Sequence, residues 1–155
     1  MWQRIQTVFL LIAIISLIAA ILLPIWVYQD NLTQTHSLFA FHYSITGKSG
    51  AVITNYFPYC LTAILAIASI TISVIEIRKF KNRILQMKLG ALNSLFLVGT
   101  IASSFLFSRD LAQTFHGGRF GLGMWLPAVA VLANLLANRF ISRDEKIVRD
   151  SNRLR

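Results

Sequence analysis

The stretch IQTVFLLIAIISLIAAILLPIWV, residues 5–27, decides the class of this protein. It contains no charged side chain, and about 20 helical residues of this kind cross a hydrocarbon core of roughly 30 Å. The apolar part of a signal peptide is shorter, about 7–15 residues, so we expect this stretch to remain as a transmembrane helix. Pro24 should kink or end the helix, and Trp26 and Tyr28 should lie at the membrane interface.

Three more apolar stretches follow, at residues 57–77, 84–107 and 124–141. Hydrophobic residues make up 55% of the 155-residue chain and charged residues only 14%, proportions typical of a membrane protein rather than a soluble domain. The sequence therefore predicts an all-α membrane fold, a bundle of four transmembrane helices in a single domain over residues 1–155. Residues 142–155 form a charged tail after the fourth span.

The connection between the first two spans has a different pattern. In SLFAFHYSIT, residues 37–46, the side chains of Phe39, Phe41, Tyr43 and Ile45 fall on one face, and the residues between them fall on the other. This period of two residues is typical of a strand. GKSG at residues 47–50 is a turn signal, and AVITNY at residues 51–56 suits a return strand. We therefore expect a small β-hairpin in the first outer loop. SRDLAQTFHGGRFGLG, residues 108–123, should form a glycine-rich loop between the third and fourth spans.

The distribution of Lys and Arg predicts the orientation. With the N-terminus inside, twelve basic residues fall on the inner side: Arg4, Arg78, Lys79, Lys81, Arg83, Lys88, Arg139, Arg143, Lys146, Arg149, Arg153 and Arg155. Only Lys48, Arg109 and Arg119 fall outside. Since cytoplasmic loops carry an excess of basic residues, both termini are expected in the cytoplasm. This clustering also accounts for the net charge of +9, so we expect no direct binding of nucleic acid.

The charged tail is predicted to be a cytoplasmic C-terminal helix. Glu145 with Arg149, and Lys146 with Asp150, place opposite charges four residues apart, a spacing that brings side chains together on a helix. The tail can contact anionic lipid head groups or a cytoplasmic partner protein. The residues expected to make these contacts are Arg143, Lys146, Arg149, Arg153 and Arg155.

Polar side chains within the spans are the main candidates for a site. Asn93 in the third span and Asn134 and Asn138 in the fourth are predicted to form an interhelical polar cluster, since such side chains usually face neighbouring helices. The alternative is a cleft that binds lipid or a small molecule. Glu76 and Lys88 are ionisable residues within the second and third spans, and we expect an ion pair between them near the cytoplasmic interface.

The sequence offers no recognisable catalytic or metal-binding set. His36, His42 and His116 have spacings that match no compact metal site, and Cys60 is the single cysteine. Ser108, Asp110 and His116 share a short segment without the arrangement of a catalytic triad. We therefore expect neither a metal nor another cofactor.

Three segments resemble the DUF4293 family, small bacterial four-helix membrane proteins grouped as a domain of unknown function. They are MWQRIQTVFLLIA at residues 1–13, FKNRILQMKLGALN at residues 80–93 and LANRFISRDEKIVRDSNRLR at residues 136–155. The resemblance implies a four-span protein of the bacterial cytoplasmic membrane. It implies no activity, substrate or catalytic residue.

Three functions fit these observations. The first is a non-enzymatic accessory or scaffolding subunit of a larger assembly in the cytoplasmic membrane, with a protein partner in the membrane. The second is a small transporter, or a lipid-binding or small-molecule-binding protein, that uses a polar cleft between the third and fourth helices, lined by Asn93, Asn134 and Asn138. The third is a membrane enzyme that acts on lipids, for which the outer side supplies only Asp30, Asp110 and the histidines.

Overall fold

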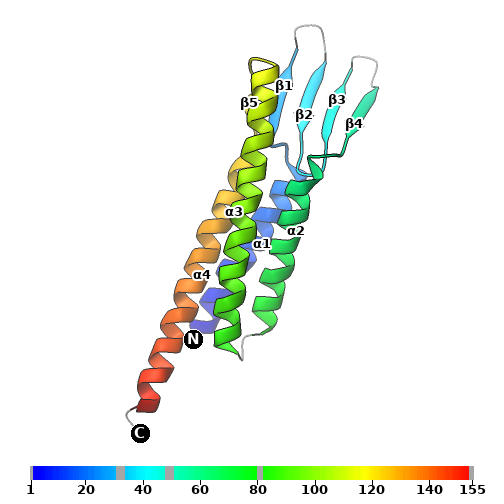
Figure 1. Ribbon diagram of the computed structural model, residues 1–155. Coiled ribbons are helices and arrows are strands. Elements are labelled where there is room, and N and C mark those ends of the chain that lie inside the picture. Colours follow the sequence, from blue (N-terminus) through cyan, green and yellow to red (C-terminus); the bar gives the residue numbers. More distant parts are fainter. Residues whose placement is uncertain (1, 31–33, 48–50, 80–81, 154–155) are drawn as a thin grey trace.

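The computed structural model describes residues 2–30, 34–47, 51–79 and 82–153. The helices are α1 (Trp2–Leu22), α2 (Cys60–Arg78), α3 (Arg83–Thr114) and α4 (Leu122–Arg153). The strands are β1 (Trp26–Gln29), β2 (Thr35–Leu38), β3 (Tyr43–Thr46), β4 (Val52–Asn55) and β5 (Arg119–Phe120). In Figure 1 the strands gather at one end of the helix bundle, here called the sheet end. The start of α1, the end of α2, the start of α3 and the end of α4 lie toward the other end, here called the terminal end.

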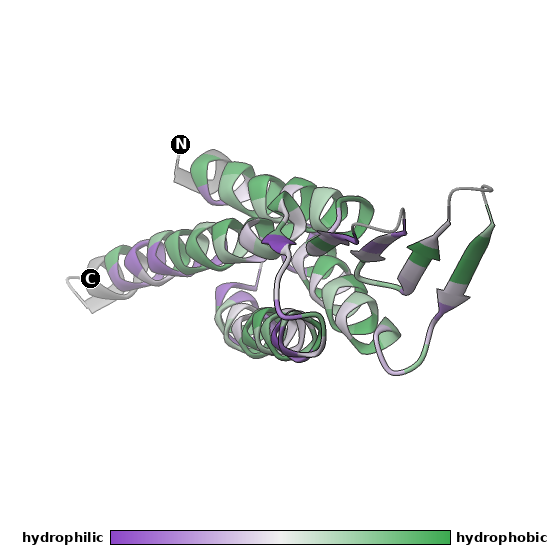
Figure 2. Cartoon of the chain, turned by 90° about the horizontal axis from the view of Figure 1, so that it is seen from above, coloured by the Kyte–Doolittle hydropathy of each residue, from purple (hydrophilic) through white to green (hydrophobic). Residues whose placement is uncertain are grey.

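All four helices are long and apolar enough to cross a membrane. Their outward faces carry exposed aliphatic side chains, among them Ile15 (65% exposed), Leu95 (68%) and Leu132 (62%). In the view along the bundle, hydrophobic colour dominates the helices (Figure 2). The interior instead contains small residues such as Ala66 and Ala130, both nearly or completely buried. Small interior side chains let helices approach closely, the arrangement common among helices that pack within lipid.

The fold is not all-α, and the prediction of a helical bundle with a single small hairpin is wrong. The strands form one five-stranded sheet in the order β4-β3-β2-β1-β5. Neighbouring strands pair antiparallel throughout, for example Trp26 with Leu38, and Leu38 with Tyr43. The prediction of one hairpin missed β1, β2 and β5. The chain is therefore a four-helix bundle with an antiparallel sheet at one end.

The first missed strand, β1, comes from the end of the first apolar stretch. The helix α1 ends at Leu22 rather than Val27, because Pro24 disfavours helical geometry in the residue before it. The chain then extends, and Trp26 is only 1% exposed. Trp26 packs in the core between the sheet and the helices, so protein atoms cover its ring, and its place at the membrane interface stays a prediction.

The stretch at residues 37–46 contains a turn rather than one continuous strand. It holds the end of β2 and all of β3, and the Phe39 amide donates to the His42 carbonyl across the turn at 2.8 Å. Ala40 at this turn is buried and accepts a hydrogen bond from the Ala63 amide of α2. This long-range contact holds the turn, and periodicity alone gives no sign of it. The return strand β4 lies within the AVITNY segment and pairs with β3. Residues 48–50 of the predicted turn lie outside the described residues.

One face of the sheet is aromatic and packs on the end of α3. The register places Trp26, Tyr28, His36, Leu38, Tyr43, Ile45 and Ile53 on this face. The Phe115 ring, just after α3, lies 4.5 Å from the His36 ring and 5.3 Å from the Tyr28 ring, centroid to centroid. Leu111 is buried in the same core. These contacts explain why α3 continues to Thr114, beyond the predicted end of the third span at residue 107.

The connection from α3 to α4 is fixed to β1 by close backbone contacts. The Gly121 amide donates to the Ile25 carbonyl at 2.8 Å, and the Gly123 amide donates to the Pro24 carbonyl at 3.1 Å. Gly118 has a φ of +110°, and a Cβ on it would collide with the Trp26 indole. The predicted glycine-rich loop is thus a short, packed segment that contains β5.

We predict that Gly118→Ala destabilises the protein by about 1–3 kcal/mol, because it adds backbone strain and a clash with Trp26. Gly117→Ala is the matched control, since its Cβ would make an ordinary contact with Tyr28 at 3.5 Å. Unfolding of the purified protein in detergent measures both. Equal stability of the two variants would contradict the packing described for Gly118.

Candidate functional site

The centre of the bundle contains a hydrogen-bond network that we call the amide network: Ser69, Ser73, Gly90, Asn93, Ser94 and Asn134. The Ser69 hydroxyl donates to Asn93 Oδ1 at 2.5 Å. Asn93 Nδ2 donates to Ser73 Oγ at 2.8 Å and to Asn134 Oδ1 at 3.0 Å. Asn134 Nδ2 donates in turn to Ser94 Oγ at 2.9 Å and to the Gly90 carbonyl at 3.2 Å. The network therefore connects α2, α3 and α4.

Helical periodicity explains why these residues meet. Ser69 and Ser73 are four residues apart on α2, and Gly90 and Asn93 are three apart on α3, so each pair lies on one side of its helix. All of them are buried. The two side-chain amides use both of their N–H donors within the network. Asn93 and Asn134 thus have no donor left for a ligand, and the geometry is that of helix packing rather than of an open cleft.

Asn138, the third predicted member, lies outside the amide network. Its side chain covers Gly90, where any Cβ would collide with the Asn138 amide group. Asn138 Oδ1 is buried without a hydrogen-bond partner in the described part of the chain. Asn138 is therefore next to the network but keeps an unused acceptor.

The predicted ion pair between Glu76 and Lys88 is absent from the described residues. Glu76 is completely buried, and neither of its carboxylate oxygens has a hydrogen-bond partner there. Lys88 is exposed on the opposite side of α3 from Gln86 and Gly90, because a step of two residues turns a helix by about 200°. The helices approach each other as expected, but their rotation keeps the two charges apart.

Gln86 is a site residue that sequence reasoning missed. It is almost completely buried, and its Nε2 donates to the Glu76 backbone carbonyl at 2.9 Å. Helical periodicity could have indicated it. Gln86 precedes Gly90 by four residues and Asn93 by seven, so all three lie on one face of α3.

At the sheet end, His36 and Tyr43 form a buried polar pair. His36 Nδ1 and the Tyr43 hydroxyl share a hydrogen bond of 2.6 Å. Burial raises the pKa of Tyr43 to about 12, and the nearby Tyr59 adds to this effect. Burial, and then Asp110, also raise the pKa of Tyr59. His36 lies one residue before the predicted strand at residues 37–46, and the observed register places it on the same face of β2 as Leu38.

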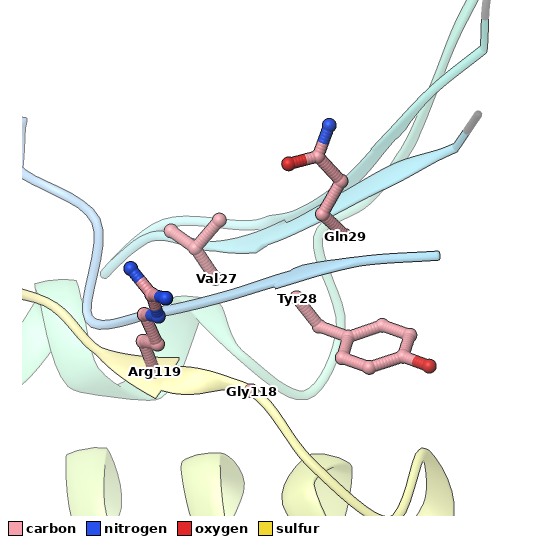
Figure 3. A pocket seen from close by; sticks show the side chains of 5 residues that line it. All are labelled: Val27, Tyr28, Gln29, Gly118 and Arg119. Atoms are coloured by element: carbon pink, nitrogen blue, oxygen red, sulfur yellow. The ribbon is translucent and has the colours of Figure 1, made fainter. Parts of the chain in front are cut away.

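The sheet has an open groove of about 470 Å³ beside β1 and β5. It is lined by Val27, Tyr28, Gln29, Gly118 and Arg119. Val27, Gln29 and Arg119 project to one side of β1, whereas the Tyr28 ring projects to the other (Figure 3). Arg119 is the only charged residue of this lining, and one guanidinium alone does not make a catalytic or anion site.

The remaining predicted site residues belong to the charged tail. Arg143 and Lys146 are exposed on the last part of α4, which continues as a helix to Arg153. The side chains of Arg149 and Arg153, and the residue Arg155, lie outside the described part of the structure. Within the described residues, no three His, Cys, Asp or Glu side chains group as a metal site. Ser108 donates to the Ser104 carbonyl at 2.7 Å and has no contact with a histidine there.

Comparison with known proteins identifies a family but no biochemical activity. A family model described as a domain of unknown function, DUF4293, matches residues 2–154, essentially the whole chain. This match confirms the resemblance carried by the three sequence segments. No curated protein matches the chain.

We predict that Asn134→Leu lowers the free energy of unfolding by about 1–3 kcal/mol, because it leaves Asn93 with an unsatisfied buried donor. Leu132→Ala is the control, since Leu132 is exposed on the same helix, and its effect should be within about 0.5 kcal/mol. Denaturant unfolding in detergent gives both values. A neutral Asn134→Leu would show that the amide network does not hold the bundle together.

We also predict that one tyrosine ionises only near pH 12, as measured by ultraviolet absorbance. The pKa of Tyr43 is raised in the folded protein from its ordinary value of 10.0. The stabilisation that this implies is complete below about pH 10 and is lost as the pH rises toward about 12. Tyr43→Phe should remove the late titration and the stability loss between these two pH values. A late titration that persists in Tyr43→Phe would assign it to another tyrosine.

Proposed function

The chain belongs to the DUF4293 family, and from the contacts above we propose that it is a non-enzymatic accessory or scaffolding subunit of a larger assembly in the bacterial cytoplasmic membrane. The observation that carries this proposal is the contrast between a closed interior and an open sheet edge. The amides of Asn93 and Asn134 donate all their hydrogens to protein groups, whereas among the described residues the outermost strand β4 has a neighbouring strand on one side only.

The proposed orientation places the terminal end in the cytoplasm. The described basic residues of this end are Arg4, Arg78, Lys79, Arg83, Lys88, Arg139, Arg143, Lys146, Arg149 and Arg153. The sheet end has Arg109 and Arg119. Because basic residues concentrate on the cytoplasmic side of membrane proteins, the sheet then faces the opposite side of the membrane. The exposed Arg143 and Lys146 are positioned to contact anionic head groups.

The closed interior supports a scaffold over the alternative of a transporter with a polar cleft. That alternative needs Asn93, Asn134 and Asn138 to line an accessible space. Asn93 and Asn134 are completely buried and donate to protein groups with both amide hydrogens. A ligand that bound these amides would have to break the hydrogen bonds between α3 and α4.

The strand β4 supplies the docking surface of the proposal. Val52 and Ile53 are 58% and 62% exposed, and Ile53 lies beside Ile45 at the end of the row that begins at Tyr28 and His36 on the inner face of the sheet. An edge strand has unpaired backbone groups that can pair with an added strand. The proposed occupant is an extended segment of a partner protein with apolar side chains at alternate positions.

A crosslinking experiment tests this proposal. Val52→Cys in a Cys60→Ala background would be labelled, in intact cells, with a membrane-impermeant photo-crosslinker. We expect one dominant adduct with another protein. Adding Ile53→Lys should reduce its yield roughly tenfold, an effect of about 1.4 kcal/mol, because a charge on an edge strand opposes pairing.

Two controls separate orientation from docking. Gln29→Lys adds the same charge to an exposed position of β1, an interior strand of the sheet, and should leave the yield unchanged. Lys146→Cys should react only after the membrane is permeabilised. Labelling of Lys146→Cys in intact cells would refute the orientation, and labelled Val52→Cys without any protein adduct would refute the docking surface.

A further inference from the structure

The terminal end of the bundle contains four buried oxygen atoms without a hydrogen-bond partner in the described residues. They are Oε1 and Oε2 of Glu76, Oε1 of Gln86 and Oδ1 of Asn138. All four are acceptors and none is a donor. Buried polar atoms without partners are rare in folded proteins, and a group of acceptors alone calls for a positively charged or donating species. We call these three residues the acceptor cluster.

Helix packing brings the three residues of the acceptor cluster together. Glu76 follows Ser73 by three residues on the face of α2 that bonds to Asn93. On the antiparallel α3, Gly90 and Gln86 follow each other on the same inward face toward the terminal end. Gln86 bonds to the Glu76 backbone, and Asn138 of α4 lies on Gly90. The cluster therefore lies one helical turn below the amide network, where α2, α3 and α4 meet.

The orientation of the Gln86 amide is fixed by its partner. An amide nitrogen and oxygen are hard to distinguish by shape alone. Here, however, the Gln86 nitrogen faces the Glu76 carbonyl, which can only accept a hydrogen bond. The Gln86 oxygen is therefore the free end of this side chain and adds an acceptor to the cluster.

Within the part of the chain that the structure describes, the Glu76 carboxylate has no hydrogen-bonded basic partner, although many basic residues belong to this end of the bundle. Arg78, Lys79, Lys88 and Arg139 are exposed, and Arg83 donates to the Asp144 backbone carbonyl at 2.8 Å. Glu76 also lies in the last turn of α2, where the helix dipole disfavours a negative charge. The missing basic partner and the helix dipole both raise the free energy of an ionised carboxylate at this position. A bound cation would offset this increase.

We propose that the acceptor cluster of Glu76, Gln86 and Asn138 binds an alkali-metal cation such as Na⁺ or K⁺. One carboxylate and two neutral amide oxygens carry a formal charge of −1, which a monovalent cation neutralises. Oxygen donors of this kind suit hard cations rather than transition metals. The cation would join α2, α3 and α4 at the terminal end. This site is independent of the proposed docking function, since the edge strand β4 lies at the sheet end.

The test measures thermal unfolding of the full-length protein in detergent at fixed pH and ionic strength. Sodium, potassium or lithium chloride would replace the chloride of N-methyl-D-glucamine, a cation too large for the cluster. We expect the midpoint to rise with the concentration of at least one small cation and to saturate. A rise of about 5–10 °C is expected at 100 times the dissociation constant.

Variants assign the effect to the cluster. Glu76→Gln keeps the shape of the side chain and removes its charge, so the rise should disappear. Glu145→Gln, which removes a carboxylate from the end of α4, should retain the full rise. Asn138→Ala removes one ligand and should raise the apparent dissociation constant about tenfold or more. If Glu76→Gln does not fold, the apparent dissociation constant of Asn138→Ala tests the proposal.

Three results would overturn the proposal. The first is equal stability in the small cations and in N-methyl-D-glucamine. The second is a full cation response in Glu76→Gln. The third is an unchanged apparent dissociation constant in Asn138→Ala.

Discussion

The hydrogen bonds among Asn93, Asn134 and the two serines of α2 are the interaction on which the rest of the fold depends. The helices are apolar on their outer faces, so in lipid the hydrophobic effect contributes little to their association. Close packing of small residues and hydrogen bonds must then hold the helices in register. Asn93 contacts both α2 and α4, and thereby fixes the rotation of three helices at once.

That rotation determines which polar groups are satisfied and which are not. Nearer the sheet, Thr62 donates to Ser103 at 3.0 Å, and Ser103, Ser104 and Ser108 donate to carbonyls of α3. One turn toward the terminal end, the same helix faces present Glu76 and Gln86 with oxygen atoms that lack partners. Polar groups at the centre of the bundle are thus hydrogen-bonded, whereas at its terminal end some buried oxygen atoms lack hydrogen-bond partners in the described residues.

The sheet extends the bundle through the end of α3. Phe115 and Leu111 place aromatic and aliphatic side chains under β1 and β2, and the backbone of residues 121–123 bonds to the carbonyls of Pro24 and Ile25. These contacts cover the inner face near β1 and leave β4 open. The sheet end and the terminal end therefore differ in the groups that are available for binding. One presents a free strand edge, and the other presents buried oxygen ligands.

The sequence by itself determined four apolar helices, the basic terminal end, the return strand β4 and the polar faces that contain Asn93 and Asn134. These features follow from composition and from the periodicity of single helices or strands, which are local properties of the chain. Tertiary structure alone decided that Trp26 begins a strand, that residues 39–42 turn, and that Glu76 faces Gln86 rather than Lys88. Strand partners and helix rotations depend on contacts between segments far apart in the sequence, and local periodicity does not specify them.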